Sequence, residues 1–327
     1  SRAFLPNYFP NYKKYLWIDC DAWVQEWSSI ELYFKACEDG KLGITQTMAS
    51  GYRIMSKVKW LFGKLAVIKS QNFKHAISSK IGIEKAKDFG VSTVTIGNSH
   101  HNGALAAYLK NIVDEGFIAI IKSSVPSNST VAPFGGTEPL FTPNPMAIGF
   151  PTNNLPVIID ISASITTNNM IAEKIANKQK FDFNCLLTSE GIPSNDPLEV
   201  RDKSGTVLPV GGMEYGHKGY GLALGIEALS QGLSGFGRVD NPKSMNLSTF
   251  IQIIDPEFFS GLDEFKKQMS HTVSKAKKNK PIPGKTIYIP GERALIKRQK
   301  ALKNGIFLSE TTKSSLKEIS TRFNENF

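Results

Sequence analysis

Apolar positions between residues 79 and 121 follow two spacings, one typical of helices and one typical of strands. Helical spacing over 79–90 and 104–115 predicts two helices, each closed by a glycine. Apolar, largely β-branched runs over 91–96 and 117–121 predict two strands. The order helix, strand, loop, helix, strand predicts an α/β unit, and its crossover favours parallel pairing of the strands.

Further runs of both kinds occur along the rest of the chain. Strand patterns recur over 156–161 and 249–255, and helical patterns over 222–233 and 293–304. Aromatic residues are dense near the N-terminus, where only the amphipathic stretch 31–37 predicts a helix. The pattern as a whole indicates a mixed α/β protein without internal repeats.

The composition fits a globular protein long enough for two domains. The chain has 327 residues, 41% of them hydrophobic, and no apolar run reaches the ~18 residues that a membrane span needs. No basic head followed by an apolar stretch begins the chain, so we expect a cytoplasmic protein. The three scattered cysteines form no CxxC pair, which predicts free, buried thiols: Cys20, Cys37 and Cys185.

The chain is basic, with a formal net charge of +10 and a pI of about 9.3. This balance suits nucleic acids, an anionic membrane surface, or an enzyme whose cofactor and substrate are both anions. One lysine cluster has no interleaved aromatic residue beyond Phe265, which favours a solvated helix face over a nucleic-acid surface: Lys266, Lys267, Lys275, Lys277, Lys278 and Lys280.

Two adjacent histidines, His100 and His101, fall in the turn between a predicted strand and the following helix. In open α/β sheets, ligands bind beyond the carboxyl ends of the strands, so this turn is a candidate site. Adjacent histidines point in different directions and neither belongs to an HxxxH or HxE motif, which argues against a metal site. Acid/base chemistry is the better use, because the imidazole pKa lies near neutrality.

The fingerprints GxGxxG and GxxxxGK[ST] are both absent. Instead, residues 210–221 form a glycine-rich turn ahead of an apolar helix. Backbone amides there could approach a phosphate, with Lys218 adding charge. A tight turn with close helix packing explains the same glycines equally well.

Several motifs together resemble the malate/L-lactate dehydrogenase family, which has the L-sulfolactate dehydrogenase-like fold. Residues 98–103, followed by Tyr108, look like the family's NSxHxG…Y motif. Further matches fall in the family's order and together span about residues 80–310: Ala132-Pro133-Phe134-Gly135-Gly136, Asn144-Pro145-Met146-Ala147, Asp160-Ile161-Ser162-Ala163-Ser164, His217-Lys218-Gly219-Tyr220-Gly221 and Pro290-Gly291-Glu292-Arg293.

The resemblance implies an α/β fold with a nucleotide-binding domain that is not of the Rossmann type, which accounts for the missing GxGxxG. It implies a homodimer that binds NAD or NADP in an extended form. Residues 1–118 with 275–327 would form an N/C-terminal domain for substrate binding and dimerisation, and residues 119–274 the cofactor-binding domain. His101 would be the acid/base, and the cofactor contacts would be Ser127, Asp160, Ile161, Ser162, His217, Lys218, Gly291, Glu292 and Arg293.

One family motif has no counterpart. The family carries SHGxxR near its N-terminus, whose histidine and arginine handle the substrate. Residues 24–29 stand where SHG is expected, and residues 50–53 are only a partial echo. The departure puts substrate recognition in question.

The leading hypothesis is therefore an NAD(P)-dependent interconversion of a 2-hydroxy acid, best malate, and its 2-oxo acid. Malate is chosen because it is a common substrate of the family. The alternatives are a reductase of a cyclic imino acid or diketo sugar acid, and a catalytically inactive relative that binds nucleotide. A nucleic-acid-binding protein is the remaining alternative, motivated by the charge.

Overall fold

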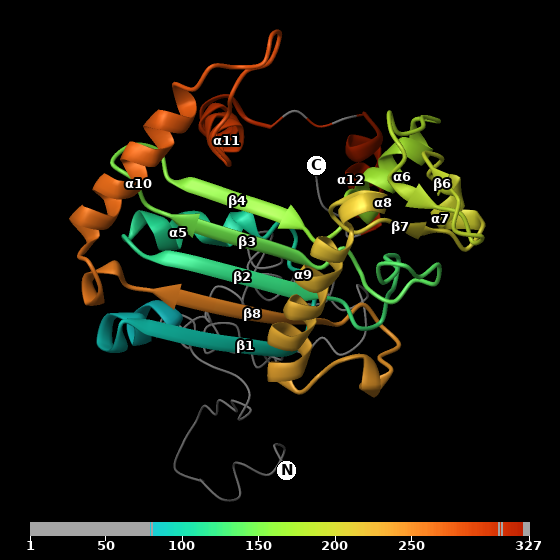
Figure 1. Cartoon of the computed structure of the whole chain (residues 1–327), viewed down its shortest axis with the longest axis horizontal. Coiled ribbons are helices and arrows are strands. Elements are labelled where there is room, and N and C mark those ends of the chain that lie inside the picture. Colours follow the sequence, from blue (N-terminus) through green and yellow to red (C-terminus); the bar gives the residue numbers. More distant parts are fainter. Residues whose placement is uncertain (1–78, 80, 307, 309, 323–327) are drawn as a thin grey trace, which may run out of the picture.

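The computed structural model describes residues 79, 81–306, 308 and 310–322 (Figure 1). Three features singled out in the sequence lie outside them: the helix expected at 31–37, Cys20 with Cys37, and both candidate positions for the SHGxxR motif. A helix over 81–89 leads into the first strand, as the sequence predicts.

The central element is a five-stranded sheet (Figure 1). Its order is β1 (Val91–Ser99), β8 (Leu247–Ile254), β2 (Ile118–Ser124), β3 (Pro145–Phe150) and β4 (Val157–Ser162). All neighbouring strands are antiparallel. The expected parallel pairing of the first two strands is wrong, because β8 lies between β1 and β2 and pairs with both.

Although β1, β2 and β4 are not neighbours, they run in the same direction, since each is separated from the next by one antiparallel strand. Their carboxyl ends therefore meet at one edge of the sheet. The loops after β1 and β2 leave from this edge, which is where sequence reasoning placed the ligand site.

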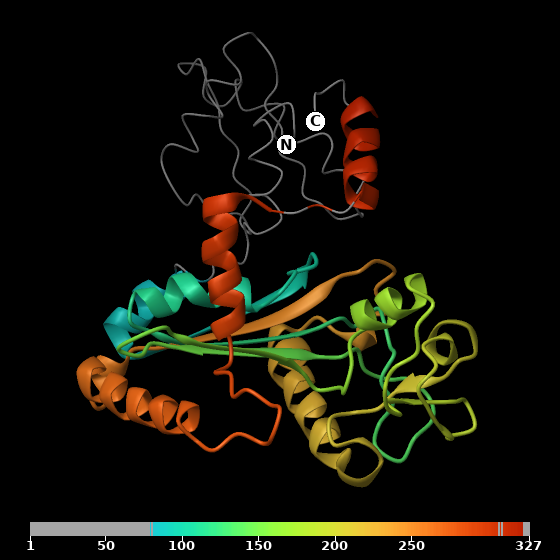
Figure 2. The same cartoon turned by 90° about the horizontal axis from the view of Figure 1, so that it is seen from above.

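One face of the sheet is covered by helix 81–89 and α5 (Ala106–Asp114), as Figure 2 shows. Side chains at alternate positions of β2 and β8 point to this face. They form the main core with the buried side of α5: Ala119, Ile121, Ile251, Ile253, Leu109, Ile112 and Val113. The hydrophobic burial of this layer fixes α5, and with it the loop that precedes α5, against the sheet.

The opposite face carries α9 (His217–Glu227), the short π-helix η3 (Ala228–Gly232) and α10 (Leu262–Lys277) (Figures 1 and 2). The predicted helix over 222–233 thus begins earlier and changes to π geometry in its last turn. The lysine cluster lies on α10 and just beyond it, and its side chains are mostly exposed, which agrees with a solvated helix face.

A smaller three-stranded sheet packs beyond the carboxyl edge, in the order β6 (Pro193–Ser194), β5 (Leu186–Leu187), β7 (Thr206–Val207). It has a core of its own that includes Cys185, and burial raises the pKa of this thiol to about 11. Cys185 is therefore a buried, free thiol, as predicted. The remaining elements are α6 (Asn168–Ala176), α7 (Leu198–Asp202), α8 (Gly212–Tyr215), η4 (Arg238–Asp240), η5 (Pro256–Phe258), α11 (Glu292–Asn304) and α12 (Glu310–Arg322).

The division into domains at residue 118 stays a prediction. β1 and β2, which lie on either side of that position, belong to the same sheet.

Within the described ranges, no helix combines the length and the apolar composition that crossing a membrane requires.

Candidate functional site

The loop after β1 presents His101, the proposed acid/base, as an exposed side chain. The backbone N–H of Gly103 donates a hydrogen bond of 2.9 Å to His101 Nδ1. Gly103 has a φ of 70°, in the left-handed region that glycine adopts without strain, and this turn brings its N–H back toward the ring. A neutral imidazole that accepts at Nδ1 carries its proton on Nε2.

Asn102, the next residue, is buried and anchors the same loop to the sheet. Its Nδ2 donates to Ser123 Oγ at 3.0 Å and to Thr249 Oγ1 at 3.1 Å, at the ends of β2 and β8. Tyr108 of α5 donates from its hydroxyl to the Asn102 carbonyl at 2.6 Å, and burial raises the pKa of this tyrosine. His101 thus projects from a loop that is held on three elements.

Asp160 of β4 joins the edge strand to the start of α5. Its Oδ2 accepts a hydrogen bond of 2.9 Å from the Ala106 backbone N–H, in the first turn of the helix. Leu105, at the N-cap, makes no side-chain cap, so the carboxylate of a distant strand supplies one. Desolvation raises the pKa of Asp160, against the opposing effect of the Ala106 and Leu105 amides.

The two residues after Asp160 differ in their exposure. Ile161 is 46% exposed, an unusual position for a large apolar side chain in a strand. Ser162 ends β4 and donates from Oγ to the Ser164 carbonyl at 2.7 Å, which turns the chain beyond the sheet.

His217 and Lys218 begin α9 and are both exposed. The helix start is fixed to the chain just past β4, because Val210 N–H donates to the Ala163 carbonyl at 2.9 Å and Gly219 N–H to the Val210 carbonyl at 3.0 Å. The rings of His217 and Phe134 pack edge to face, with their centroids 5.8 Å apart. Lys218 Nζ lies 5.0 Å from the centroid of the Tyr215 ring.

The segment 291–293 lies at the outer edge of β4, where Ile158 N–H donates to the Pro290 carbonyl at 3.2 Å. A Cβ on Gly291 would come within 2.7 Å of Ile158 Cβ, so this close approach needs glycine. Lys277 Nζ donates to both carboxylate oxygens of Glu292, at 2.7 and 2.8 Å, and this ion pair, helped by the Ile289 N–H, lowers the pKa of Glu292. The Arg293 guanidinium lies 4.9 Å from the Tyr288 ring centroid.

The malate/L-lactate dehydrogenase family model matches residues 72–317 of this chain. The chain belongs to this family. The match confirms the resemblance that the motifs carry.

Two relatives and one solved structure illustrate the similarity. The chain is 32% identical over 252 residues to a malate dehydrogenase from Pyrococcus abyssi, covering 74% of this chain and 69% of the relative. It is also 32% identical over 246 residues to an L-sulfolactate dehydrogenase from Methanocaldococcus jannaschii, covering 73% of this chain and 69% of the relative. The crystal structure of a malate dehydrogenase from Entamoeba histolytica matches with a TM-score of 0.73 and 29% identity, covering 79% of this chain and 75% of that one.

These matches confirm the α/β, L-sulfolactate dehydrogenase-like fold. The family contains nicotinamide-dependent oxidoreductases, among them dehydrogenases of small 2-hydroxy acids. Other relatives are a ureidoglycolate dehydrogenase (NAD(+)) from Escherichia coli and a Δ1-pyrroline-2-carboxylate/Δ1-piperideine-2-carboxylate reductase from Pseudomonas syringae.

Three features of this chain suit the binding of a nicotinamide dinucleotide. The first turn of α9 contains Lys218 and no acidic residue, so its helix N-terminus is a favourable place for a phosphate. The exposed Ile161 offers an apolar surface to a planar ring. An apolar cavity of about 180 Å³ is lined by residues that include Pro133, Phe134 and Met213, and Phe134 also contacts the His217 ring. The donors and surfaces present therefore fit the cofactor that the family uses.

The structure brings most of the candidates to the carboxyl edge of the sheet and the outer edge of β4. Ser127 follows β2 on an exposed loop, and Arg238 links the residues beside it to Glu227, at the end of α9 opposite to His217 and Lys218. In the described part of the chain, no hydrogen bond joins His101 directly to another candidate, and no three His, Cys, Asp or Glu side chains group as metal ligands.

Sequence reasoning missed three residues that hold the site. Asn102 and Asn144 sit inside recognised motifs, so their positions were visible but their anchoring role was not. Arg238 had no signal, because the pairing of its guanidinium with Glu227 spans eleven residues and an intervening π-helix.

Proposed function

We propose that this protein is an NAD(P)-dependent dehydrogenase that interconverts a 2-hydroxy acid, best malate, and its 2-oxo acid. The observation that carries the proposal is the exposed His101, which projects from an anchored loop that leads into the helix capped by the cofactor candidate Asp160. The family supplies the reaction class, and the malate dehydrogenases among the relatives support malate.

His101 is the group that moves the proton. A bound nicotinamide supplies the acceptor for the hydride that leaves C2 of the hydroxy acid. The proton of the substrate hydroxyl goes to the imidazole, and the C2–O bond becomes a carbonyl. In the reverse direction the imidazolium returns this proton to the 2-oxo oxygen.

The hydrogen bond from Gly103 to Nδ1 describes the resting state of the ring. An imidazole with Nδ1 engaged and a proton on Nε2 has no free lone pair, so it cannot accept another proton. We infer that substrate binding opens the Gly103 bond. Catalytic hydrogen bonds are often formed only in the complex with substrate, which agrees with this step.

Most of the residues that would hold the cofactor lie on β4, at its outer edge or at the start of α9, while Ser127 lies apart, on the loop after β2. Lys218 and the start of α9 would neutralise phosphate charge, and Asp160 and the segment 291–293 would line the nucleotide. Ile161, Ser162, His217 and Ser127 complete the set. We further propose that the protein is a homodimer in the cytoplasm.

A reductase of a cyclic imino acid is the second candidate function. The reductase from Pseudomonas syringae among the relatives favours it, at 26% identity. Both reactions use the same hydride and proton positions, so the choice depends on the substrate pocket and not on His101.

The test follows the absorbance of reduced nicotinamide with oxaloacetate and either NADH or NADPH, using the full chain. Rapid loss of absorbance supports the dehydrogenase and shows which nucleotide is preferred. His101→Asn should lower kcat by about 10²–10⁴-fold, the usual contribution of a general acid/base, with unchanged nucleotide affinity by calorimetry. The neighbouring His100→Asn is the matched control and should retain turnover.

Several outcomes would contradict the proposal. Wild-type turnover in His101→Asn removes the mechanism. Oxidation of NADH or NADPH only with cyclic imino acids moves the assignment to the second candidate. Nucleotide binding without turnover on any oxo or imino acid identifies an inactive relative.

A further inference from the structure

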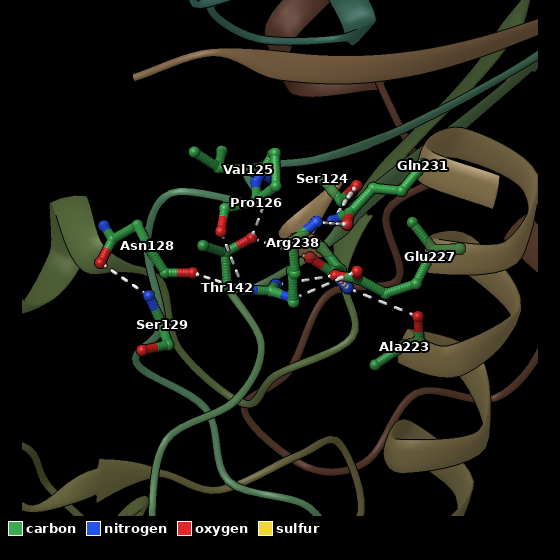
Figure 3. Close-up of polar contacts among 12 residues, drawn as sticks. Ser124, Val125, Pro126, Asn128, Ser129, Thr142, Ala223, Glu227, Gln231 and Arg238 are labelled. Atoms are coloured by element: carbon green, nitrogen blue, oxygen red, sulfur yellow. Dashed lines mark hydrogen bonds and ion pairs between the residues drawn. The ribbon is translucent and has the colours of Figure 1, made fainter. Parts of the chain in front are cut away.

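Arg238, in η4, contacts both loop carbonyls that flank Ser127 (Figure 3). Its Nη1 donates to the Asn128 carbonyl at 3.0 Å and to the Pro126 carbonyl at 3.4 Å. Ser127 itself is exposed, while Pro126 is buried. The guanidinium thus fixes the backbone on both sides of a residue that points to solvent.

The other edge of the same guanidinium binds the last residue of α9. Arg238 Nη2 donates to Glu227 Oε1 at 2.9 Å and Nε to Oε2 at 3.3 Å, a two-point pairing of planar groups. The side chains are only 24% and 14% exposed, so solvent screens this pair less than a surface salt bridge.

Glu227 is in turn tied to the sheet. Its Oε1 accepts a hydrogen bond of 2.9 Å from Asn144 Nδ2, and Asn144 is fully buried directly before β3. Thr142 donates to Asn144 Oδ1 at 2.8 Å. The Glu227 carboxylate therefore has a fixed position, and it holds the guanidinium of Arg238 in a fixed position as well.

The π-helix η3 supplies a third anchor. Gln231 Oε1 accepts from the Arg238 backbone N–H at 3.0 Å, while Gln231 Nε2 donates to Ser124 Oγ at the end of β2 at 3.0 Å (Figure 3). Ser124 also shares a 2.7 Å hydrogen bond with Ser230. The extra residue of a π-turn is a frequent device at functional sites, and here Ser230 and Gln231 are both buried.

We propose that Arg238 is a positioning residue for the dinucleotide, acting through the loop 126–128 that presents Ser127. This inference rests on the proposed function, because it takes Ser127 as a cofactor contact. A loop held at two carbonyls loses less conformational freedom when a ligand binds, so its affinity is higher than that of a free loop.

Arginine is needed for this role because four hydrogen bonds leave one planar group in two directions. Lysine has the charge but only a point-like ammonium with three donors, so it cannot pair with both oxygens of Glu227 and reach both carbonyls. The proposal therefore predicts that lysine rescues only part of the effect, whereas a role limited to charge predicts full rescue.

The test compares Arg238→Met and Arg238→Lys with the wild type as full-length chains. Calorimetry gives the Kd of NADH and NADPH, steady-state kinetics with oxaloacetate separates KM from kcat, and thermal melts report stability. Arg238→Met should raise both the Kd and the KM of the nucleotide about tenfold, which corresponds to the loss of one or two hydrogen bonds. The change in kcat should be smaller. The nucleotide Kd and KM of Arg238→Lys should lie between those of the wild type and those of Arg238→Met.

Arg201→Met is the matched control. Arg201 also forms a two-point pair, donating to Asp202 at 2.7 and 2.8 Å, but it lies on α7 in the smaller sheet region and both groups are about half exposed. This variant should leave nucleotide Kd, KM and kcat unchanged.

Two results would overturn the proposal. The first is an Arg238→Met protein that melts at a lower temperature but binds nucleotide like the wild type. The second is an Arg238→Lys protein with wild-type affinity. If Arg238→Met does not fold, Arg238→Lys decides. A wild-type protein that binds neither nucleotide contradicts the proposed function itself, which is a distinguishable failure.

Discussion

The Asp160 carboxylate accepts a hydrogen bond from the Ala106 backbone N–H at 2.9 Å, so a residue of the edge strand caps the helix that follows the His101 loop. The contact joins two parts of the chain that are 54 residues apart. It couples the proposed cofactor contacts on β4 to the loop of the proposed acid/base, because a shift of β4 moves the start of α5.

Asp160→Asn should alter the pH dependence of stability in a defined direction. Desolvation raises the pKa of Asp160 above its ordinary value of 3.8, so its contribution to stability is complete below 3.8 and is lost as pH rises through the folded-state pKa. The asparagine keeps an acceptor for Ala106 but does not titrate. Urea unfolding from pH 3.5 to 7 should therefore show the wild type losing stability relative to the variant as pH rises.

Asp202→Asn provides a control of opposite sign. Arg201 lowers the pKa of Asp202, so this carboxylate stabilises the protein above its ordinary pKa and the effect is lost as pH falls. The wild type should thus gain stability relative to Asp202→Asn as pH rises. The same trend in both variants would contradict the assignment for Asp160.

Gly219→Ala should unfold more easily and bind nucleotide less well. A Cβ at this position would lie 2.3 Å from the Val210 nitrogen and 2.7 Å from the Ala163 carbonyl oxygen, both backbone atoms. The first turn of α9 would have to move away from β4, displacing His217 and Lys218. We expect a loss of about 2–4 kcal/mol in the free energy of unfolding, measured with urea.

Gly221→Ala is the matched variant two residues along the same helix. No atom outside the immediate chain lies within 4 Å of its Cβ position. Alanine is the better helix former in a helix interior, so this variant should gain up to ~1 kcal/mol. Equal free energies of unfolding for the two variants would show that Gly219 does not pack against the backbone of Val210 and Ala163.

Local pattern predicted four strands of the central sheet, β1, β2, β4 and β8, but neither β3 nor the pairing of the strands. The run 249–255 predicted the strand that became β8, yet its place between β1 and β2 depends on contacts more than a hundred residues apart. The glycines at 216, 219 and 221 made a helix start at His217 look unfavourable, and close packing of Gly219 overrides that preference.

The candidate site shows the same difference between residues with a local sequence signal and residues whose role depends on distant contacts. His101 was identified because a histidine after a strand has both a local signal and a family motif. The Arg238–Glu227 pair has neither, since the two residues are eleven apart and lie in separate elements, so they lack the i, i+4 spacing that marks helical ion pairs. The anchoring of Asn102 was equally hidden, because both acceptors come from distant strands.

Asn102→Ala should lower kcat through the position of His101. The substitution removes the two hydrogen bonds that tie the loop to β2 and β8, and leaves Ser123 and Thr249, whose hydroxyls are 3.3 Å apart, to bond each other. A small displacement of a catalytic group is costly, so we expect kcat to fall by about 10- to 100-fold. Nucleotide affinity should stay at the wild-type level, because none of the proposed cofactor contacts is on this loop.

Asn195→Ala separates this effect from a general loss of stability. Its Nδ2 donates to the Phe181 carbonyl at 3.0 Å, and Phe181 belongs to the core of the smaller sheet, so the substitution removes a hydrogen bond outside the main core. Both variants should lose about 1–2 kcal/mol in urea unfolding. Only Asn102→Ala should lose turnover in the oxaloacetate assay; equal kcat values in the two would mean that the buried amide stabilises the fold without positioning the histidine.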